Sequence, residues 1–195
     1  MKTIGIIGAG NLGKRLTQLI CRNNLQNFLV VSDRNQEKME EIADTYDLDK
    51  TDNEDTIKIS DILFLTVKPN NIKNVCNEIN KYYQYDIPKI IISAAAGVPV
   101  ENIKKWTNNK HTVVRCMPNI PISEKEGSVV WYSENINTYD VNFINDVITQ
   151  GPENVWVDKE NLIDVATVVS GCGPAYIAKF FQTYTDIGED MGFSR

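Results

Sequence analysis

A glycine-rich turn directly after a short apolar run constrains the fold of this chain more than any other feature. Residues 4–7 are apolar enough to form a strand buried on both faces, and this run stops at Gly8. Apolar residues then recur at helical spacing, at Leu12, Leu16, Leu19 and Ile20. Gly8, Gly10 and Gly13 therefore spell G-x-G-x-x-G across a strand-to-helix turn, which is the context that a dinucleotide-binding turn requires.

Each of these glycines has its own physical reason in that interpretation. We expect Gly8 to make the tight turn, Gly10 to let the backbone approach a pyrophosphate, and Gly13 to let the helix pack closely against the strand. The pyrophosphate would lie at the positive end of the helix, where free N–H groups face it.

Two other interpretations of the turn stay open at this point. Gly8, Gly13 and Lys14 nearly complete a phosphate-binding P-loop, but Arg15 stands where that motif needs a serine or threonine to hold magnesium. The glycines could also form a plain turn, because a single G-x-G-x-x-G is weak evidence.

Length, charge and cysteine usage bound the remaining possibilities. A chain of 195 residues forms one large domain or one and a half, and it can bury a sizeable core. The formal net charge of -6 argues against a nucleic acid or a membrane surface as a partner. Four cysteines without a CxxC pair and a single histidine make a metal site improbable and fit a cytoplasmic protein with reduced thiols. We expect neither a signal peptide nor a membrane-spanning segment.

A second apolar run, residues 28–31, ends at Ser32, Asp33 and Arg34. In a dinucleotide-binding fold this position meets the adenosine ribose. Asp33 favours NAD, because a carboxylate can accept hydrogen bonds from both ribose hydroxyls, whereas Ser32 and Arg34 favour the 2′-phosphate of NADP. The choice of dinucleotide stays open, and so does a simpler role as a solvated turn that caps the next helix.

Strand-like and helix-like segments alternate along the first half of the chain. The pattern predicts a helix at 36–46, a strand at 62–67, a helix around 72–79 and a strand at 89–93. Such alternation is typical of a parallel sheet that helices cover on both faces. We therefore assign the chain to the α/β class, with a Rossmann-type, doubly wound, mainly parallel sheet.

The second half is less regular. Residues 113–114 lead into a segment with prolines at 118 and 121, which favours a shaped loop over a regular strand. Further strands are expected at 127–132 and 154–157, around a helix at 139–148.

The last forty residues differ in character from the rest of the chain. Residues 162–169 are almost entirely apolar, residues 170–174 should break the chain, and a helix should start at Pro174. The apolar residues of that helix spread around most of its circumference, so one face against a domain cannot bury them all. We expect this helix to have a partner.

Several segments together resemble the pyrroline-5-carboxylate reductase family over nearly the whole chain. They are Gly8-Ala9-Gly10-Asn11-Leu12-Gly13, Val67-Lys68-Pro69, Ser93-Ala94-Ala95-Ala96-Gly97, Arg115-Cys116-Met117-Pro118-Asn119, Glu126-Gly127 and Ser170-Gly171-Cys172-Gly173-Pro174-Ala175-Tyr176. Any one of these motifs is weak, but their order and spacing together are specific.

The resemblance implies hydride transfer from NADPH, or from NADH, to the cyclic imine 1-pyrroline-5-carboxylate, which gives L-proline. Hydride adds readily to a protonated C=N, so such a protein can work by positioning and electrostatics without a strong general acid. The resemblance also implies a dinucleotide-binding domain over 1–158, the start of an all-α dimerisation domain over 159–195, and a homo-oligomer formed through the C-terminal helix.

The resemblance further implies which residues bind the ligands. Gly8, Gly10, Asn11, Leu12 and Gly13 would cradle the pyrophosphate, Ser32 and Arg34 would meet the adenosine end, and Asn53 its ribose. Val67, Lys68 and Pro69 would flank the nicotinamide ribose, Ala95 and Ala96 would lie near the nicotinamide, and Met117, Pro118 and Asn119 would wall the substrate pocket. Structural roles stay open for Lys68 as a solvated strand end, Asn119 as a turn former and Asn53 as a helix cap.

Two departures from the family pattern matter. Cys172 stands where the family usually has serine, either as a stand-in of the same shape or as a redox-sensitive thiol. The family's Ser-Pro-Gly-Gly-Thr-Thr segment, which binds the substrate carboxylate, does not occur in these 195 residues, so we expect them to show weak or no turnover. A catalytically inactive NADP-binding relative with a regulatory role, or another NADP-dependent oxidoreductase of this fold, therefore stay open as alternatives.

Overall fold

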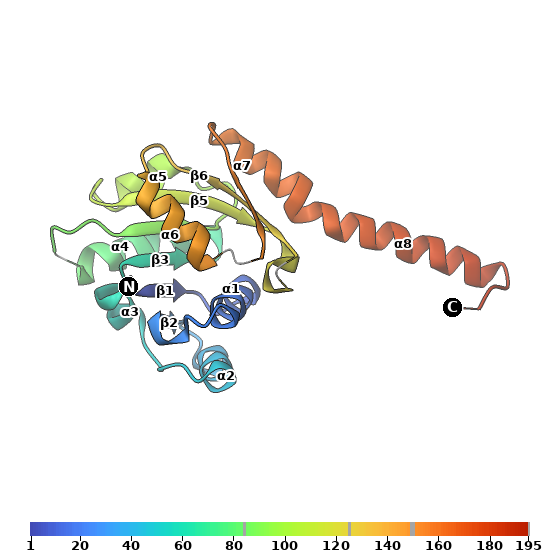
Figure 1. Ribbon diagram of the computed structural model, residues 1–195, viewed down its shortest axis with the longest axis horizontal. Helices are drawn as coiled ribbons and strands as arrows, with labels where there is room; N and C mark the ends of the chain where they lie inside the picture. Colours follow the sequence, from blue (N-terminus) through green and yellow to red (C-terminus); the bar gives the residue numbers. More distant parts are fainter. Residues whose placement is uncertain (84, 125, 149–150, 195) are drawn as a thin grey trace.

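The computed structural model describes residues 1–83, 85–124, 126–148 and 151–194 of the chain. In this part of the chain the strands form one sheet in the order β2-β1-β3-β4-β5-β6-β7, with helices packed against it (Figure 1). The strands are β1 (Ile4–Ile7), β2 (Leu29–Ser32), β3 (Ile62–Leu65), β4 (Ile90–Ser93), β5 (Thr112–Pro118), β6 (Ser128–Tyr132) and β7 (Glu153–Trp156).

Helices connect most of these strands. The α-helices are α1 (Asn11–Arg22), α2 (Gln36–Tyr46), α3 (Asn53–Ile59), α4 (Ile72–Tyr82), α5 (Val100–Trp106), α6 (Thr138–Ile148), α7 (Asn161–Ala166) and α8 (Gly173–Asp190). Short 3₁₀ turns η1 (Gln26–Phe28), η2 (Pro69–Asn71) and η3 (Ile120–Glu124) and a π-helical segment η4 (Thr167–Cys172) complete the list.

Strand order reverses at β1, which lies between β2 and β3. Both neighbours run parallel to β1, and the parallel pairing continues through β3, β4 and β5. β6 is antiparallel to β5, and β7 is parallel to β6. The predicted doubly wound, mainly parallel α/β sheet is confirmed. In such sheets ligands bind beyond the carboxyl ends of the strands at the point of reversal, here β1 and β3.

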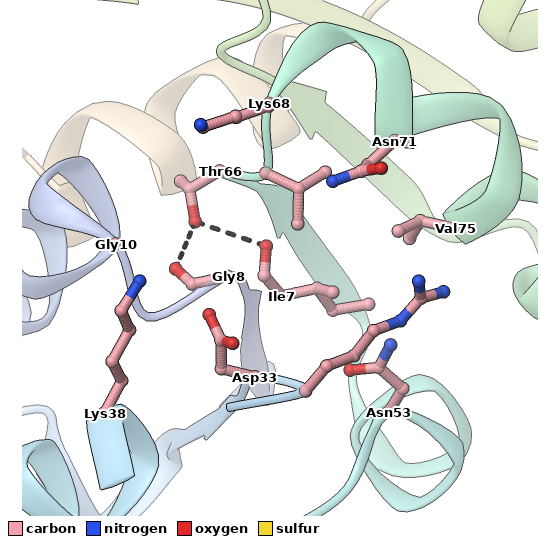
Figure 2. Close-up of a pocket in the computed structure, with 12 residues that line it drawn as sticks. Ile7, Gly8, Gly10, Asp33, Lys38, Asn53, Thr66, Lys68, Asn71 and Val75 are labelled. Carbon is pink, nitrogen blue, oxygen red and sulfur yellow. Dashed lines mark hydrogen bonds between the residues drawn. The ribbon is translucent and has the colours of Figure 1, made fainter. Parts of the chain in front are cut away.

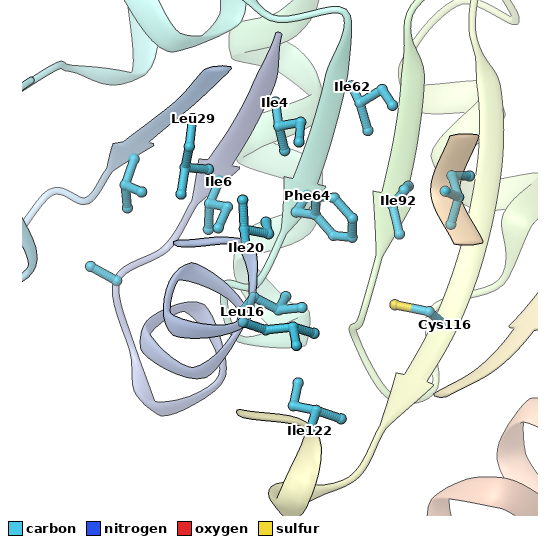
Figure 3. Packing of buried hydrophobic residues seen from close by; sticks show 14 of the residues in the cluster. Ile4, Ile6, Leu16, Ile20, Leu29, Ile62, Phe64, Ile92, Cys116 and Ile122 are labelled. Carbon is cyan, nitrogen blue, oxygen red and sulfur yellow. The ribbon is translucent and has the colours of Figure 1, made fainter. Parts of the chain in front are cut away.

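Two layers of buried apolar side chains, one on each face of the sheet, form the core. Ile62 and Phe64 of β3 face the layer that α1 and α2 cover, which Figure 3 shows, whereas Leu63 and Leu65 face the layer that α4 and α5 cover. A strand that is buried on both faces in this way appears in the sequence as a continuous apolar run. This explains why β1 and β3 could be recognised without any polar alternation.

β5 is a regular strand where the sequence favoured a shaped loop, so that prediction was wrong. Pro118 pairs with Val129 of the antiparallel strand β6. β4 ends at Ser93, which lies opposite Arg115, so beyond that point β5 has a strand on one side only. A proline lacks an N–H and is tolerated where one side of a strand is unpaired, which is why Pro118 can end β5.

The predicted break at residues 170–174 is also wrong. α7 continues through the π-helical segment η4 into α8, and Ala166, Thr167 and Gly173 all have right-handed helical backbone angles. Pro174 lies in the first turn of α8, as expected. A proline removes one i→i−4 hydrogen bond from a helix, and the wider π turn before it accommodates this change.

α8 extends away from the sheet, and the C-terminus lies at its far end (Figure 1). None of residues 173–190 is buried. Phe180, Phe181 and Tyr184 are 61%, 64% and 70% exposed, which is unusual for such large side chains. No helix in the described residues is both long and apolar enough to cross a membrane.

Candidate functional site

The chain turns sharply between β1 and α1, as expected for Gly8. Gly8 has a φ of +117°, a backbone conformation that residues with a side chain rarely adopt. A Cβ at this position would also lie 2.9 Å from the carbonyl carbon of Thr66. The N–H of Gly8 donates to the carbonyl oxygen of Ser32 at 2.8 Å, so the turn is fixed to the end of β2.

Gly13 and Gly10 have opposite surroundings. A Cβ on Gly13 would stand 1.9 Å from the carbonyl oxygen of Gly8, so α1 approaches the turn more closely than any side chain allows. A Cβ on Gly10 would meet no atom within 4 Å. Gly13 is therefore required by the packing of the fold itself, whereas the space beside Gly10 is open to a ligand.

The amino end of α1 lies at this open space, because Gly10 is its N-cap residue. No side chain caps this end, and the first turn contains no acidic residue. α1 has 12 residues, and the unpaired N–H groups at the start of such a helix attract an anion. The local backbone therefore fits a pyrophosphate.

A cavity of about 250 Å³ lies at the carboxyl edge of β1 and β3 (Figure 2). It is lined by Ile7, Gly8, Gly10, Asp33, Arg34, Lys38, Asn53, Thr66, Val67, Lys68, Asn71 and Val75. A second cavity of about 370 Å³ shares Asp33, Arg34 and Asn53 with the first and reaches Glu78 and Tyr82 of α4. The first cavity lies where the reversal of strand order predicts a ligand site, and the second adjoins it.

Thr66 connects the two strands that flank the cavity. Its hydroxyl lies 2.7 Å from the carbonyl oxygen of Gly8 and 3.2 Å from that of Ile7, and donates to both (Figure 2). The conformation of the glycine turn therefore depends on a side chain from the end of β3.

Asp33 binds backbone groups of the protein. One carboxylate oxygen accepts a 2.7 Å hydrogen bond from the N–H of Ala9, and the other accepts a 2.8 Å bond from the N–H of Asn35. Asn35 in turn caps α2 by accepting from the N–H of Lys38 at 3.0 Å. The segment after β2 therefore lines the cavity and caps the next helix, so the two interpretations of this segment are compatible.

Ser32 and Asn53 act as a pair. Ser32 is completely buried and lines neither cavity, and its hydroxyl donates to Oδ1 of Asn53 at 2.9 Å. Where the resemblance placed Ser32 in contact with the adenosine end, the structure instead has it hold Asn53, which does line both cavities. The helix-cap alternative for Asn53 was wrong, because Asp52 caps α3 by accepting from the N–H of Asp55 at 2.8 Å.

The other residues expected at the cofactor do not line the first cavity. Asn11 is exposed and Leu12 half-buried in the first turn of α1, and Pro69 is exposed at the start of η2. Ala95 is buried in the core, and Ala96 is exposed beyond the carboxyl end of β4. Their contacts with a dinucleotide stay predictions.

The expected substrate-pocket residues stand at the end of β5. Met117 packs with Ile163 and Ala166 of α7. Asn119 does form a turn, since its Oδ1 accepts from the N–H of Ser128 at 2.9 Å and so closes the connection between β5 and β6. Pro118 lies between them as the last residue of β5. Their contact with a substrate stays a prediction.

Sequence reasoning missed five residues that line the first cavity: Ile7, Lys38, Thr66, Asn71 and Val75. Thr66 could have been found, because it lies near the carboxyl end of the strand predicted at 62–67, at the edge of the sheet where Gly8 also lies. Asn71 and Val75 come from η2 and α4, and only the packing of these elements against the sheet brings them to the site.

Two of the four cysteines, Cys76 and Cys116, are buried in the core. Burial raises the pKa of Cys76 and of Cys116 to about 12, so both thiols stay protonated at neutral pH. Cys172 is exposed in η4. Among the described residues, no group of three or more His, Cys, Asp or Glu side chains is placed to hold a metal ion.

Comparison with known proteins finds similarity to one family along nearly the whole chain, far beyond the glycine turn. A family model described as "NADP oxidoreductase coenzyme F420-dependent" matches residues 3–97, and one described as "Pyrroline-5-carboxylate reductase dimerisation" matches residues 160–195. A pyrroline-5-carboxylate reductase of Pseudomonas aeruginosa is 31% identical over 195 aligned residues, which cover 98% of this chain and 71% of that protein. This chain belongs to the pyrroline-5-carboxylate reductase family.

Other members of the family are similar to this chain over the same extent. The reductase of Corynebacterium melassecola is 30% identical over 100% of this chain and 73% of its own length. Among solved structures, the reductase of Coxiella burnetii superposes with a TM-score of 0.87 at 28% identity, over 99% of this chain and 72% of that one. The Plasmodium falciparum pyrroline carboxylate reductase, solved with NADP bound, has a TM-score of 0.86 at 28% identity, over 99% and 71%.

Proposed function

We infer that this family member is an NAD(P)H-dependent pyrroline-5-carboxylate reductase, which reduces the cyclic imine 1-pyrroline-5-carboxylate to L-proline in proline biosynthesis. The observation that carries this inference is the match to such reductases over nearly the whole length of this chain. The open space beside Gly10, at the start of α1, supports it, because the pyrophosphate of a dinucleotide fits there. We propose a cytoplasmic setting for this activity.

The residues of the cavity fit a nicotinamide dinucleotide. The uncapped start of α1 and the open space beside Gly10 suit the pyrophosphate, and Arg34 and Asn53 suit the adenosine end. When bound, the dinucleotide supplies the hydride that reduces the imine carbon. We propose that Val67 and Lys68, at the other side of the cavity, flank the nicotinamide ribose.

The protein contributes position and electrostatics to this reaction. The imine carbon of a protonated C=N accepts hydride directly, so the site need not supply a strong acid at that step. Thr66 fixes the turn against which the pyrophosphate would lie. Lys38 and Lys68 line the cavity and add positive charge where an anionic cofactor enters.

We propose that the substrate binds beside η4. A Cβ on Gly171 would lie 3.7 Å from the sulfur of Met117, so the end of β5 and the π-helical segment are in contact. π turns within helices are common at functional sites. Met117, Pro118 and Asn119 would form one wall of the substrate pocket, and the second wall would come from this helix.

We further propose that the exposed apolar surface of α8 packs against a second copy of the chain. Residues 160–195 match the family's dimerisation model, and the aromatic side chains of α8 are more than half exposed. Burial of large apolar side chains between two copies stabilises such an assembly. Sedimentation of the purified chain should therefore show a dimer or a larger assembly, and a monomer at all concentrations would contradict this.

The activity is tested by following NADPH absorbance in the presence of 1-pyrroline-5-carboxylate. We expect oxidation of NADPH that depends on the substrate and yields L-proline. For a polypeptide of these 195 residues we expect turnover below about 1 per second, because the family's carboxylate-binding segment is not among them. Tight NADPH binding with no trace of substrate-dependent oxidation would instead favour the inactive, regulatory relative.

A further inference from the structure

A chain of hydrogen bonds crosses the adenosine end of the site and finishes on Glu78 of α4. Ser32 donates to Oδ1 of Asn53, and Nδ2 of Asn53 donates to Oε2 of Glu78 at 2.6 Å. The other oxygen of the same carboxylate, Oε1, lies 2.5 Å from Nη2 of Arg34. Glu78 thus joins the end of β2 to the start of α3, and its side chain is 24% exposed, against 61% for Arg34.

Glu78 differs from the other carboxylates of the second cavity in what it binds. Asp33 accepts from backbone N–H groups, Asp52 caps α3, and Glu54 pairs with Lys58 four residues along the same helix. Glu78 instead binds the two side chains, Arg34 and Asn53, that the family resemblance places at the adenosine end of the dinucleotide. It therefore competes for the same groups that the ligand would use.

This competition affects the two dinucleotides differently. A 2′-phosphate carries close to two negative charges and is best bound by a guanidinium, so NADPH must take Arg34 from Glu78. A free 2′-hydroxyl carries no charge and can donate a hydrogen bond to a carboxylate. Glu78 thus lowers the affinity for NADPH, which carries the 2′-phosphate, and leaves the affinity for NADH largely unchanged.

We propose that Glu78 is a specificity-determining residue, which holds Arg34 away from a 2′-phosphate and so narrows the preference for NADPH over NADH. This inference rests on the proposed dinucleotide-binding function. Glu78 does not touch the reacting atoms, and its effect is confined to the adenosine end of the ligand.

The test compares dissociation constants for NADPH and NADH, measured by titration at one fixed, low ionic strength. In Glu78→Gln the amide oxygen can still accept from Asn53, but the charge that holds Arg34 is gone. We expect the ratio of NADPH affinity to NADH affinity to rise about three- to fivefold, a modest change because Arg34 is exposed to solvent. In the Arg34→Gln background the same Glu78→Gln change should have at most about a twofold effect on that ratio.

A matched control removes a carboxylate from an ion pair outside both cavities. Glu134 pairs with Lys104 of α5, and Glu134→Gln should leave the ratio unchanged. If wild-type protein binds both dinucleotides but Glu78→Gln leaves the ratio as it was, the role of Glu78 is overturned while the proposed function stands. The role of Glu78 would also be overturned if Glu78→Gln raised the affinity ratio equally in the wild-type and Arg34→Gln backgrounds. If wild-type protein binds neither dinucleotide, the proposed function fails as well.

Discussion

The hydroxyl of Thr66 donates a 2.7 Å hydrogen bond to the carbonyl oxygen of Gly8, and so joins the end of β3 to the glycine turn after β1. Thr66→Val keeps the shape of the side chain and removes this donor. We expect a loss of about 1–2 kcal/mol in the free energy of unfolding, because a buried carbonyl loses its partner. NADPH affinity should fall about fivefold, since the turn is held less firmly.

Thr66→Ser is the matched control for this substitution, because it retains the hydroxyl and loses only a methyl group. Urea unfolding and an NADPH titration of both variants separate the contribution of the hydroxyl from that of the methyl group. The account of the turn is contradicted if Thr66→Val and Thr66→Ser bind NADPH equally well.

Gly13→Ala should destabilise the fold although alanine favours helices. In an ordinary helix interior the change from glycine to alanine stabilises by roughly 1 kcal/mol. Here the new Cβ would stand 1.9 Å from the carbonyl oxygen of Gly8, so the helix or the turn must move. We expect a net loss of about 2–3 kcal/mol, measured by urea unfolding. If Gly13→Ala were as stable as wild-type protein, α1 could move away from the glycine turn at no cost, and the close packing would not require glycine.

The ion pairs of Arg115 should contribute unequally to stability. Arg115 is 2% exposed, and Glu160, at 26%, binds both its Nη1 at 2.9 Å and the N–H of Val100 at 2.7 Å. Glu160→Ala leaves a buried guanidinium short of a partner and should cost about 2–3 kcal/mol. Asp164, also 2.9 Å from Arg115, is 58% exposed, so Asp164→Ala should cost less than about 1 kcal/mol. Equal losses in the two variants by denaturant unfolding would contradict this ranking.

His111 should make the fold less stable in mild acid. Burial, with smaller contributions from Lys89 and Lys110, lowers the pKa of His111 from 6.5 to about 4. Between those pH values the unfolded chain binds a proton that the folded chain does not, so stability falls as the pH drops from 6.5 toward 4 and this contribution is constant above 6.5. We expect about 1–2 kcal/mol to be lost between pH 7 and pH 5.

The matched variant for this prediction is His111→Asn, whose side-chain oxygen can still accept from the N–H of Lys89 as Nδ1 of His111 does at 3.1 Å. Urea unfolding at pH 7 and pH 5 gives the difference directly. The variant should lose less stability over this range than wild-type protein, and identical losses would show that another group titrates.

Local patterns were enough to predict the first strands of the sheet and the glycine turn. β1, α1 and α2 follow from apolar periodicity and glycine placement, because each depends on neighbouring residues alone. β5 could not be predicted in the same way. A strand tolerates Pro118 only where one of its sides is unpaired, and this depends on β4 ending opposite Arg115. The continuous helix through Thr167–Cys172 was missed because glycine and proline signal a break unless a π turn intervenes.

The candidate site was predictable to the extent that it lies at strand ends. Six of the residues that the resemblance assigned to the cofactor line the first cavity: Gly8, Gly10, Arg34, Asn53, Val67 and Lys68. The burial of Ser32 and the position of Glu78 beside Arg34 depend on how α3 and α4 pack against the sheet. No pattern in the sequence shows that Glu78 and Arg34, 44 residues apart, meet.

Gly10→Ala tests the central claim, that the open space beside Gly10 holds the pyrophosphate of a nicotinamide dinucleotide. The φ of −73° and ψ of −172° at Gly10 suit alanine, and the added Cβ meets no protein atom within 4 Å. The methyl group would instead occupy space needed by the ligand. Calorimetric titration with NADPH, beside thermal unfolding of the same samples, measures both effects. We predict saturable binding by wild-type protein, a loss of about tenfold or more in Gly10→Ala, and unchanged unfolding. Absence of saturable binding by wild-type protein, or equal affinity in Gly10→Ala, would contradict the claim.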